Sequence, residues 1–330
     1  VVPARACHWI TPNCQHITDG SIHYYGIHKN AQDKDSSGNP LSIEKIRELY
    51  HQEIKAHLLQ NMQMPADAEV VQVVGDSASF SRRGTSQAKY YLARQLQENN
   101  VVLYGYTGHE DANGNRCVNA AVSDVLAEKR MLAQAIGNLV AFHTPTALTT
   151  WGCTGPNLQH YVIVYGDDDS KRETGTVFGD DVITSDFMAD RLIMLEGGVQ
   201  SFLQACNALR LGQRISILND LRSEEKGFCL EFAGVSHMDM YGRPNEIQTP
   251  YFASSRFLKE VEKLVAQHPA EKIEEVLQKW YRSYFGKGKC YLADPKRGDY
   301  DTKQKLMDQA WKLFMEEKLY LKIPELVNRF

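Results

Sequence analysis

The sequence predicts an α/β fold with a mostly parallel, doubly wound sheet. Short runs of apolar residues alternate with segments of helical periodicity, and glycine or serine turns follow several of these runs. Strands that are apolar on both faces and alternate with helices are typical of a parallel sheet covered by helices. We therefore expect a Rossmann-like domain over about residues 66–222, between an N-terminal extension (1–65) with one amphipathic helix and a mainly helical C-terminal region (223–330).

The composition is that of an ordinary globular protein. The 330 residues are 43% hydrophobic and carry a formal net charge of -4, so no overall basic field favours nucleic acid. The longest apolar runs are far shorter than the roughly 18 residues that span a bilayer. Seven irregularly spaced cysteines favour reduced thiols over a disulfide framework. These features predict a cytoplasmic protein that binds neither nucleic acid nor membranes.

The N-terminal extension is expected to contain one helix. Its first 40 residues are polar and show little periodicity, whereas apolar residues recur at helical spacing over 41–62. Cys7, His8, Cys14 and His16 cluster near the start, but their spacing matches no common zinc finger. We expect a loop there and no metal.

The central elements alternate between strand and helix. Strands are predicted over 69–75, 101–108, 139–145, 160–166, 190–198 and 214–219, and helices over 84–100, 116–135 and 199–213. In the C-terminal region, helical periodicity covers 254–267, 270–284 and 302–319. Lysine and glutamate on the polar faces of these last helices indicate a solvent-exposed side.

Three of the predicted strands end in turns that contain small residues. The candidate ligand-binding residues are Gly75, Ser77 and Ser79 in the first turn, Gly105, Gly108, Arg116 and Asn119 in and after the second, and Gly197, Gly198 and Ser201 in the third. Ligands of open parallel sheets bind at the carboxyl ends of the strands, and helix N-termini attract anions. The three turns therefore predict one pocket for a nucleotide-type ligand.

The turns match neither the P-loop motif nor G-x-G-x-x-G. In their order they resemble the superfamily of Lonely-Guy and lysine decarboxylase-like proteins, together with the nucleotide-sensing SLOG domains. VVGDSAS is similar to the family's first-strand turn, VLYGYTG to its YGGG turn, GNRCVNAAVSDVL to the next helix, and LIMLEGGVQSFLQACNAL to its PGGxGTxxE segment. The resemblance covers roughly residues 68–220. It implies a nucleotide or nucleoside phosphate as ligand, with Gly197 and Gly198 as the paired glycines and Ser201 as the hydroxyl that meets the phosphate.

The third turn departs from the family pattern. Glu196 stands in place of the proline, Gln200 in place of the third glycine, and Gln204 in place of the glutamate that catalytic members use against the ribose. The arginine-lysine motif that the family has just before the strand leading into this turn is also absent, since DDVITSDFMAD stands there. A glutamine is neither a base near neutral pH nor a negative charge for an oxocarbenium-like sugar. The departures therefore predict that the family's phosphoribohydrolase reaction is lost.

Acidic residues elsewhere could still serve catalysis. Glu110 and Asp111 lie in the loop after the second strand, and Glu196 lies in the third turn. A solvated polar loop is the alternative interpretation for Glu110 and Asp111. The three aspartates at 167–169 could bind a divalent cation, but a solvated turn is the simpler interpretation. No other cofactor is indicated.

Three functions stay open at this point. The first is binding of a nucleotide or nucleoside phosphate without the family's chemistry, which the retained glycines and the lost glutamate favour. The second is a nucleotide-processing hydrolase or phosphate-transfer enzyme that uses relocated acids. The third is a protein-interaction scaffold, in which the aromatic segment KWYRSYF packs on a partner instead of in the core. A homodimer is left open in each case.

Overall fold

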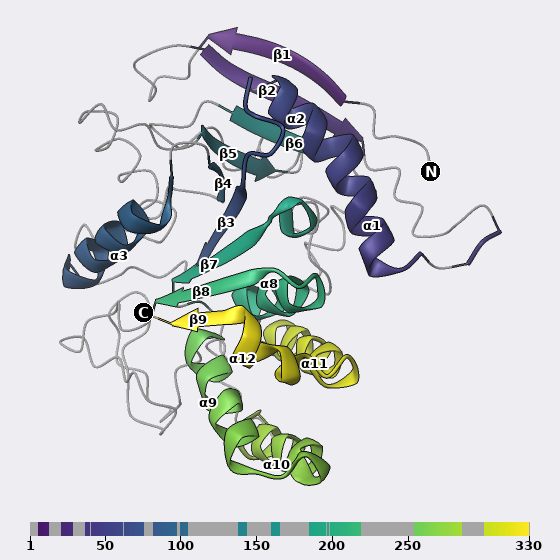
Figure 1. Ribbon diagram of the computed structural model, residues 1–330, viewed down its shortest axis with the longest axis vertical. Coiled ribbons are helices and arrows are strands. Elements are labelled where there is room, and N and C mark those ends of the chain that lie inside the picture. The colour runs from purple at the N-terminus through teal and green to yellow at the C-terminus, as the bar shows by residue number, and fades with distance from the viewer. Residues whose placement is uncertain are drawn as a thin grey trace. The chain divides into compact units, whose positions relative to one another are not determined.

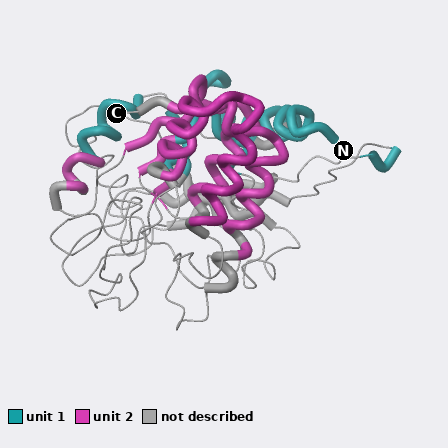
Figure 2. The backbone as a smooth tube through the Cα atoms, turned by 90° about the horizontal axis from the view of Figure 1, so that it is seen from below, with its two compact units in different colours: residues 1–73, 89–108, 119–192 teal, residues 74–88, 109–118, 193–330 magenta. Residues whose placement is uncertain are grey.

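The computed structural model describes residues 6–12, 21–28, 37–39, 41–61, 63–75, 82–97, 100–104, 138–143, 160–165, 185–195, 197, 199–218, 254–285 and 300–329 (Figure 1). The chain divides into two compact units, coloured separately in Figure 2. Unit 1 comprises residues 1–73, 89–108 and 119–192, and unit 2 comprises residues 74–88, 109–118 and 193–330.

Unit 1 contains a largely parallel sheet with the strand order β1-β2-β6-β5-β4-β3. The strands are β1 (Ala6–Pro12), β2 (Ser21–His28), β3 (Val70–Gly75, whose last two residues belong to unit 2), β4 (Val101–Tyr104), β5 (Asn138–His143) and β6 (His160–Tyr165). The pairs β3–β4, β4–β5, β5–β6 and β2–β6 are parallel, and β1–β2 is antiparallel. The expected α/β fold with a parallel sheet is confirmed.

The centre of this sheet is as apolar as the sequence suggested. Val70, Val71, Val101 and Val102 have no exposed surface at all. Buried on both faces, such valine-rich strands gain stability from their side chains, and β-branched residues suit the extended backbone. The predicted strands over 69–75, 101–108, 139–145 and 160–166 therefore correspond to β3, β4, β5 and β6.

The strands β1 and β2 differ from the loop expected over the first 40 residues. Their sequences, ACHWITP and SIHYYGIH, contain the aromatic and β-branched residues that favour strands. Histidines and a glycine interrupt these residues, so neither segment shows a clear alternation. Strand β2 pairs with β6 and β1 pairs with β2, and a local sequence pattern cannot reveal such pairing.

The expected helix over 41–62 is confirmed as one continuous helical segment. It consists of α1 (Ile43–Leu49), the π-helical η1 (Tyr50–Lys55) and α2 (Ala56–Asn61). The Ser42 hydroxyl accepts a hydrogen bond from the main-chain N–H of Lys45 at 3.2 Å and so caps the first turn. Tyr50, Leu58 and Leu59 form its buried side.

Three side chains of this helix, spaced four residues apart, hold the segment that leads into the next strand. Arg47 Nη2 donates to the carbonyl of Ala189 (3.3 Å), His51 Nε2 lies 3.0 Å from the carbonyl of Phe187, and Lys55 Nζ donates to Asp190 (2.5 Å). The Phe187 carbonyl lies in a helical turn at 185–188 and the Ala189 carbonyl directly after it, where the last C=O groups of a helix lack intrahelical partners. The helical segment 43–61 therefore fixes this turn.

The pH dependence of stability should reveal His51. Burial, followed by the positive charges of Lys55 and Arg47, lowers the pKa of His51 below its ordinary value of 6.5. The folded state thus favours the neutral ring, and the unfolded chain binds the proton more readily. We expect the free energy of unfolding to fall as the pH drops below 6.5 toward the folded-state pKa, and to be insensitive to His51 above this range.

The variant His51→Gln provides the comparison, since its amide can still donate to Phe187. Urea unfolding of both proteins between pH 7.5 and 5 would be measured, so that carboxylate titrations common to both cancel. The wild type should lose stability relative to the variant as the pH falls through this window. A constant difference would show that His51 does not titrate as expected.

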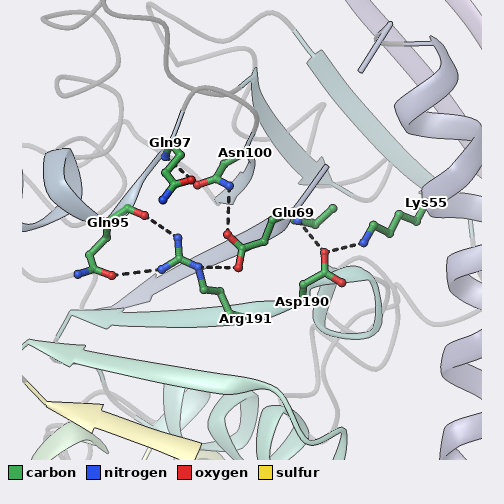
Figure 3. A network of polar contacts seen from close by, with 8 residues as sticks. Lys55, Glu69, Gln95, Gln97, Asn100, Asp190 and Arg191 are labelled. Atoms are coloured by element: carbon green, nitrogen blue, oxygen red, sulfur yellow. Dashed lines mark hydrogen bonds and ion pairs between the residues drawn. The ribbon is translucent and has the colours of Figure 1, made fainter. Parts of the chain in front are cut away.

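A second polar network joins the amino ends of β3 and β7 (Arg191–Leu195) with the residues just before β4 (Figure 3). Arg191 Nε lies 3.1 Å from Glu69 Oε1, and Arg191 Nη2 donates to the carbonyl of Gln95 at 2.6 Å. Asn100 donates to Glu69 at 3.1 Å, and Asp190 accepts from the main-chain N–H of Val70 at 2.8 Å. These bonds set the starting points of the strands.

Removal of the Arg191 guanidinium should destabilise the protein. Arg191→Met keeps the apolar stem but leaves Glu69 and the Gln95 carbonyl without this donor, and the Arg191 side chain is only 10% exposed. We expect a loss of roughly 2–3 kcal/mol, below the value for a fully buried pair because Glu69 reaches solvent. Lys45→Met, which breaks an ion pair exposed by nearly half, is the matched control and should change little. Urea unfolding would measure both, and equal losses would contradict the prediction.

Unit 2 contains the later strands and the C-terminal helices. Its strand order is β7-β8-β9, with β8 at Arg214–Leu218 and β9 at Val327–Arg329; the first two residues of β7 belong to unit 1, and the β8–β9 pair is parallel. Helix α3 (Arg82–Gln95) begins in this unit. The remaining helical elements are α8 (Val199–Arg210), α9 (Ser254–Gln267), η3 (Ala270–Lys272), α10 (Ile273–Phe285), α11 (Tyr300–Glu316), η5 (Leu319–Lys322) and α12 (Ile323–Leu326).

Aromatic side chains form the core between α8, α9, α10 and α11. Phe202 of α8 packs on Phe257 at 4.8 Å and on Phe314 at 5.6 Å between ring centroids. Trp311 stacks on Tyr281 at 4.4 Å with nearly parallel rings. Offset and edge-to-face pairs of this kind add to the stability that burial alone provides. The helices expected over 254–267, 270–284 and 302–319 are confirmed, whereas η5, α12 and β9 were not expected.

Candidate functional site

The described part of the candidate site is a strand, turn and helix in unit 2. The residues Ile193, Met194 and Leu195 of β7 are fully buried, and α8 starts four residues later at Val199. Gly197 in the turn is buried and has a φ of 116°. Residues with a Cβ rarely adopt this backbone conformation, so the turn requires glycine at this position.

Ser201 connects this turn to the end of β3. It is the third residue of α8, it is only 4% exposed, and its Oγ donates to the carbonyl of Gly75 at 3.2 Å. Gly75 is the last residue of β3. The structure thus brings together one candidate residue of the first predicted turn and one of the third, as expected for strands that end at the same edge.

The contacts at both ends of β3 and β7 show that these neighbouring strands run in the same direction. At their amino ends, Asp190 accepts from the Val70 N–H, and Arg191 bonds to Glu69. Beyond their carboxyl ends, Ser201 meets Gly75. The turn between β7 and α8 therefore lies at the carboxyl edge, where open parallel sheets bind ligands. The network of Figure 3 lies at the amino edge, so we assign it a structural role.

The hydrogen bond to Gly75 limits what Ser201 can offer a ligand. A serine hydroxyl has one proton and two lone pairs, and the Gly75 carbonyl already accepts the one hydrogen bond that the hydroxyl can donate. A phosphate accepts hydrogen bonds, so contact with Ser201 would require the hydroxyl to rotate away from Gly75. Without that rotation, the first main-chain N–H groups of α8, which lack intrahelical partners, are the donors at this turn.

Gln204 lies one turn further along α8 and is partly exposed. Its amide carries no charge and cannot take up a proton near neutral pH. Residue 204 can therefore form hydrogen bonds but cannot act as a base.

The other candidate residues lie outside the described part of the chain. These are Ser77, Ser79, Gly105, Gly108, Glu110, Asp111, Arg116, Asn119, Glu196 and Gly198, together with the aspartates at 167–169 and with Cys14 and His16. Within the described residues, no group of three or more His, Cys, Asp or Glu side chains could hold a metal ion.

Sequence reasoning did not single out several of the polar contacts that the described structure contains. The buried pair Gln72 and Asp186, joined at 2.8 Å, and the trio Arg47, His51 and Lys55 lie outside the three glycine- and serine-containing turns. A four-residue spacing of basic side chains on one helix was the available signal for the trio. The thiol of Cys206 is buried, and its burial raises its pKa well above the ordinary range.

Comparisons with known proteins provide no further assignment. No protein-family model matches the sequence, and no curated protein is significantly similar to it. In the described residues, no helix has the length and apolar character needed to cross a membrane.

The backbone of the turn can be tested through its glycine. Gly197→Ala should lower the free energy of unfolding by roughly 2–3 kcal/mol, because a Cβ is strained at a φ of 116°. The control is Gly212→Ala just after α8, where φ is 67° and an added Cβ meets nothing within 4 Å. Because an alanine tolerates that left-handed conformation better, Gly212→Ala should lower the free energy of unfolding by only about 1 kcal/mol. Urea unfolding would measure both variants, and a loss at Gly197 no larger than at Gly212 would contradict the assigned geometry.

Proposed function

We propose that this protein binds a nucleotide or nucleoside phosphate in a Rossmann-like crevice at the carboxyl ends of β3 and β7, without the phosphoribohydrolase reaction. The observation that carries this proposal is the meeting of Ser201 and Gly75 beside a turn that requires glycine at Gly197. Such a strand, turn and helix presents main-chain N–H groups and the positive end of the helix dipole, which suit an anionic group.

The surrounding fold supports the same function. A parallel sheet accompanied by helices is an architecture in which ligands bind at the carboxyl edge. The doubly wound arrangement and the likeness to the nucleotide-binding superfamily are parts of this proposal. They agree with the apolar strands and with the glycine-containing turn between β7 and α8.

The loss of the family's reaction is proposed from Gln204. A glycosidic bond to ribose breaks through an oxocarbenium-like transition state, which a carboxylate stabilises and an amide does not. A protein that keeps the turn and lacks this carboxylate is suited to bind the ligand without cleaving it. The segment KWYRSYF, proposed for a partner in the scaffold alternative, contributes Trp280 and Tyr281 to the aromatic core instead.

Thermal unfolding in the presence of AMP, GMP, CMP, UMP and the four nucleosides tests the proposal. At least one nucleotide should raise the Tm by several degrees, since a ligand at 100 times its Kd stabilises the folded state by about 2.7 kcal/mol. Gly197→Ala should reduce this shift, because it distorts the turn, and Gly212→Ala should retain it. No shift with any of these compounds would contradict the proposed function.

Chromatography of the same mixtures distinguishes binding from cleavage. We expect each bound nucleotide to be recovered intact, without free base, because Gln204 cannot assist departure of the base. Release of base would favour the enzyme alternative, and Glu110→Ala and Glu196→Ala would then identify the relocated acid. Hydrolysis that persists in both variants would exclude these two side chains.

A further inference from the structure

Helix α8 is attached at both of its ends within unit 2. Near its start, Ser201 donates to the Gly75 carbonyl. At its other end, Lys322 Nζ donates to the carbonyls of Leu209 (3.1 Å) and Arg210 (3.3 Å), and Arg210 Nε bonds to Glu317 at 2.8 Å. The twelve residues of α8 span roughly 18 Å at 1.5 Å per residue. One rigid element therefore connects the proposed ligand turn to the C-terminal segments.

The aromatic core begins one residue after Ser201. Phe202 is fully buried and touches Phe257 of α9 and Phe314 of α11. Phe257 in turn lies 4.9 Å from Trp280 and 5.7 Å from Trp311, measured between ring centroids. A backbone movement at Ser201 therefore reaches two tryptophans through one layer of phenylalanine rings.

Close packing determines how such a movement proceeds. Interiors packed at the density of organic crystals do not deform continuously, so the Phe202 ring cannot shift without its neighbours. The last turn of α8 is held by Lys322 and by the Arg210–Glu317 pair. A ligand that draws the first turn of α8 toward itself would therefore tilt the helix about its held end and displace α9 and α11.

We propose that α8 transmits ligand occupancy from the turn at Gly197 to helices α9 and α11, so that the C-terminal helices respond to the ligand and in turn set its affinity. This inference rests on the proposed function, because it requires a ligand at the turn. Binding free energies couple reciprocally, so loosening the far end of α8 must change the affinity at the near end.

The tryptophans provide the readout. The chain has four, Trp9, Trp151, Trp280 and Trp311, and the double variant Trp9→Phe/Trp151→Phe leaves only the two of the aromatic core. This variant would be titrated with whichever of AMP, GMP, CMP and UMP gives the largest thermal shift. The fluorescence should change saturably, with the Kd that calorimetry gives. Hydrogen exchange over 254–267 and 300–316 should change with it.

Variants at the held end test the reciprocal effect. Lys322→Met and Glu317→Gln should each weaken binding of the same nucleotide about fivefold or more, because a loosened α8 presents the turn correctly less often. Lys312→Met, which removes an exposed ion pair with Glu316 on α11, is the control and should leave the Kd unchanged. Affinities are measured well below each variant's Tm, so that partial unfolding of a destabilised variant does not change the measured Kd.

The outcomes separate this inference from the proposed function. Calorimetric binding with unchanged fluorescence and exchange, and with equal Kd values for Lys322→Met and Lys312→Met, would overturn the coupling and leave nucleotide binding intact. Absence of binding for all four nucleotides in calorimetry would overturn both.

Discussion

The hydrogen bond from the main-chain N–H of Val70 to the Asp190 carboxylate fixes the alignment on which the candidate site depends. It joins the starts of two strands that lie 120 residues apart in the chain. Lys55 holds the same carboxylate from the helical segment 43–61, and Arg191 holds Glu69 directly beside it. Because β3 has six residues and β7 has five, an aligned start brings their carboxyl ends close enough for Ser201 to reach Gly75.

The two edges of these strands thus have different chemistry. At the amino edge, the charges of Lys55, Asp190, Glu69 and Arg191 are paired with one another, and the two carboxylates remain partly exposed. At the carboxyl edge, the described contacts are few and mostly to the main chain. Open parallel sheets generally bind ligands at the carboxyl edge, because the N-termini of the following helices lie there.

The sequence predicted the elements whose signal is local. The valines of β3 and β4, the apolar run of β7 and the periodicity of α8, α9, α10 and α11 require no knowledge of distant residues. The strand β9 escaped prediction because Val327, Asn328 and Arg329 become a strand only by pairing with β8. The meeting of Gly75 with the third turn followed from parallel topology. The direction of the Ser201 hydroxyl did not, because it depends on which acceptor the fold brings nearest.

The acceptor of the Ser201 hydroxyl determines how a phosphate could bind at this turn. In a phosphate-binding turn the hydroxyl donates to the ligand, but here the acceptor is a carbonyl of the neighbouring strand. A phosphate, which only accepts, can recruit the Ser201 proton only by replacing that carbonyl as acceptor, which removes this hydrogen bond between α8 and β3. Recruitment of the hydroxyl and release of α8 would then be one event, and since Phe202 is the next residue in the helix, the aromatic core would be the first part of the protein to respond.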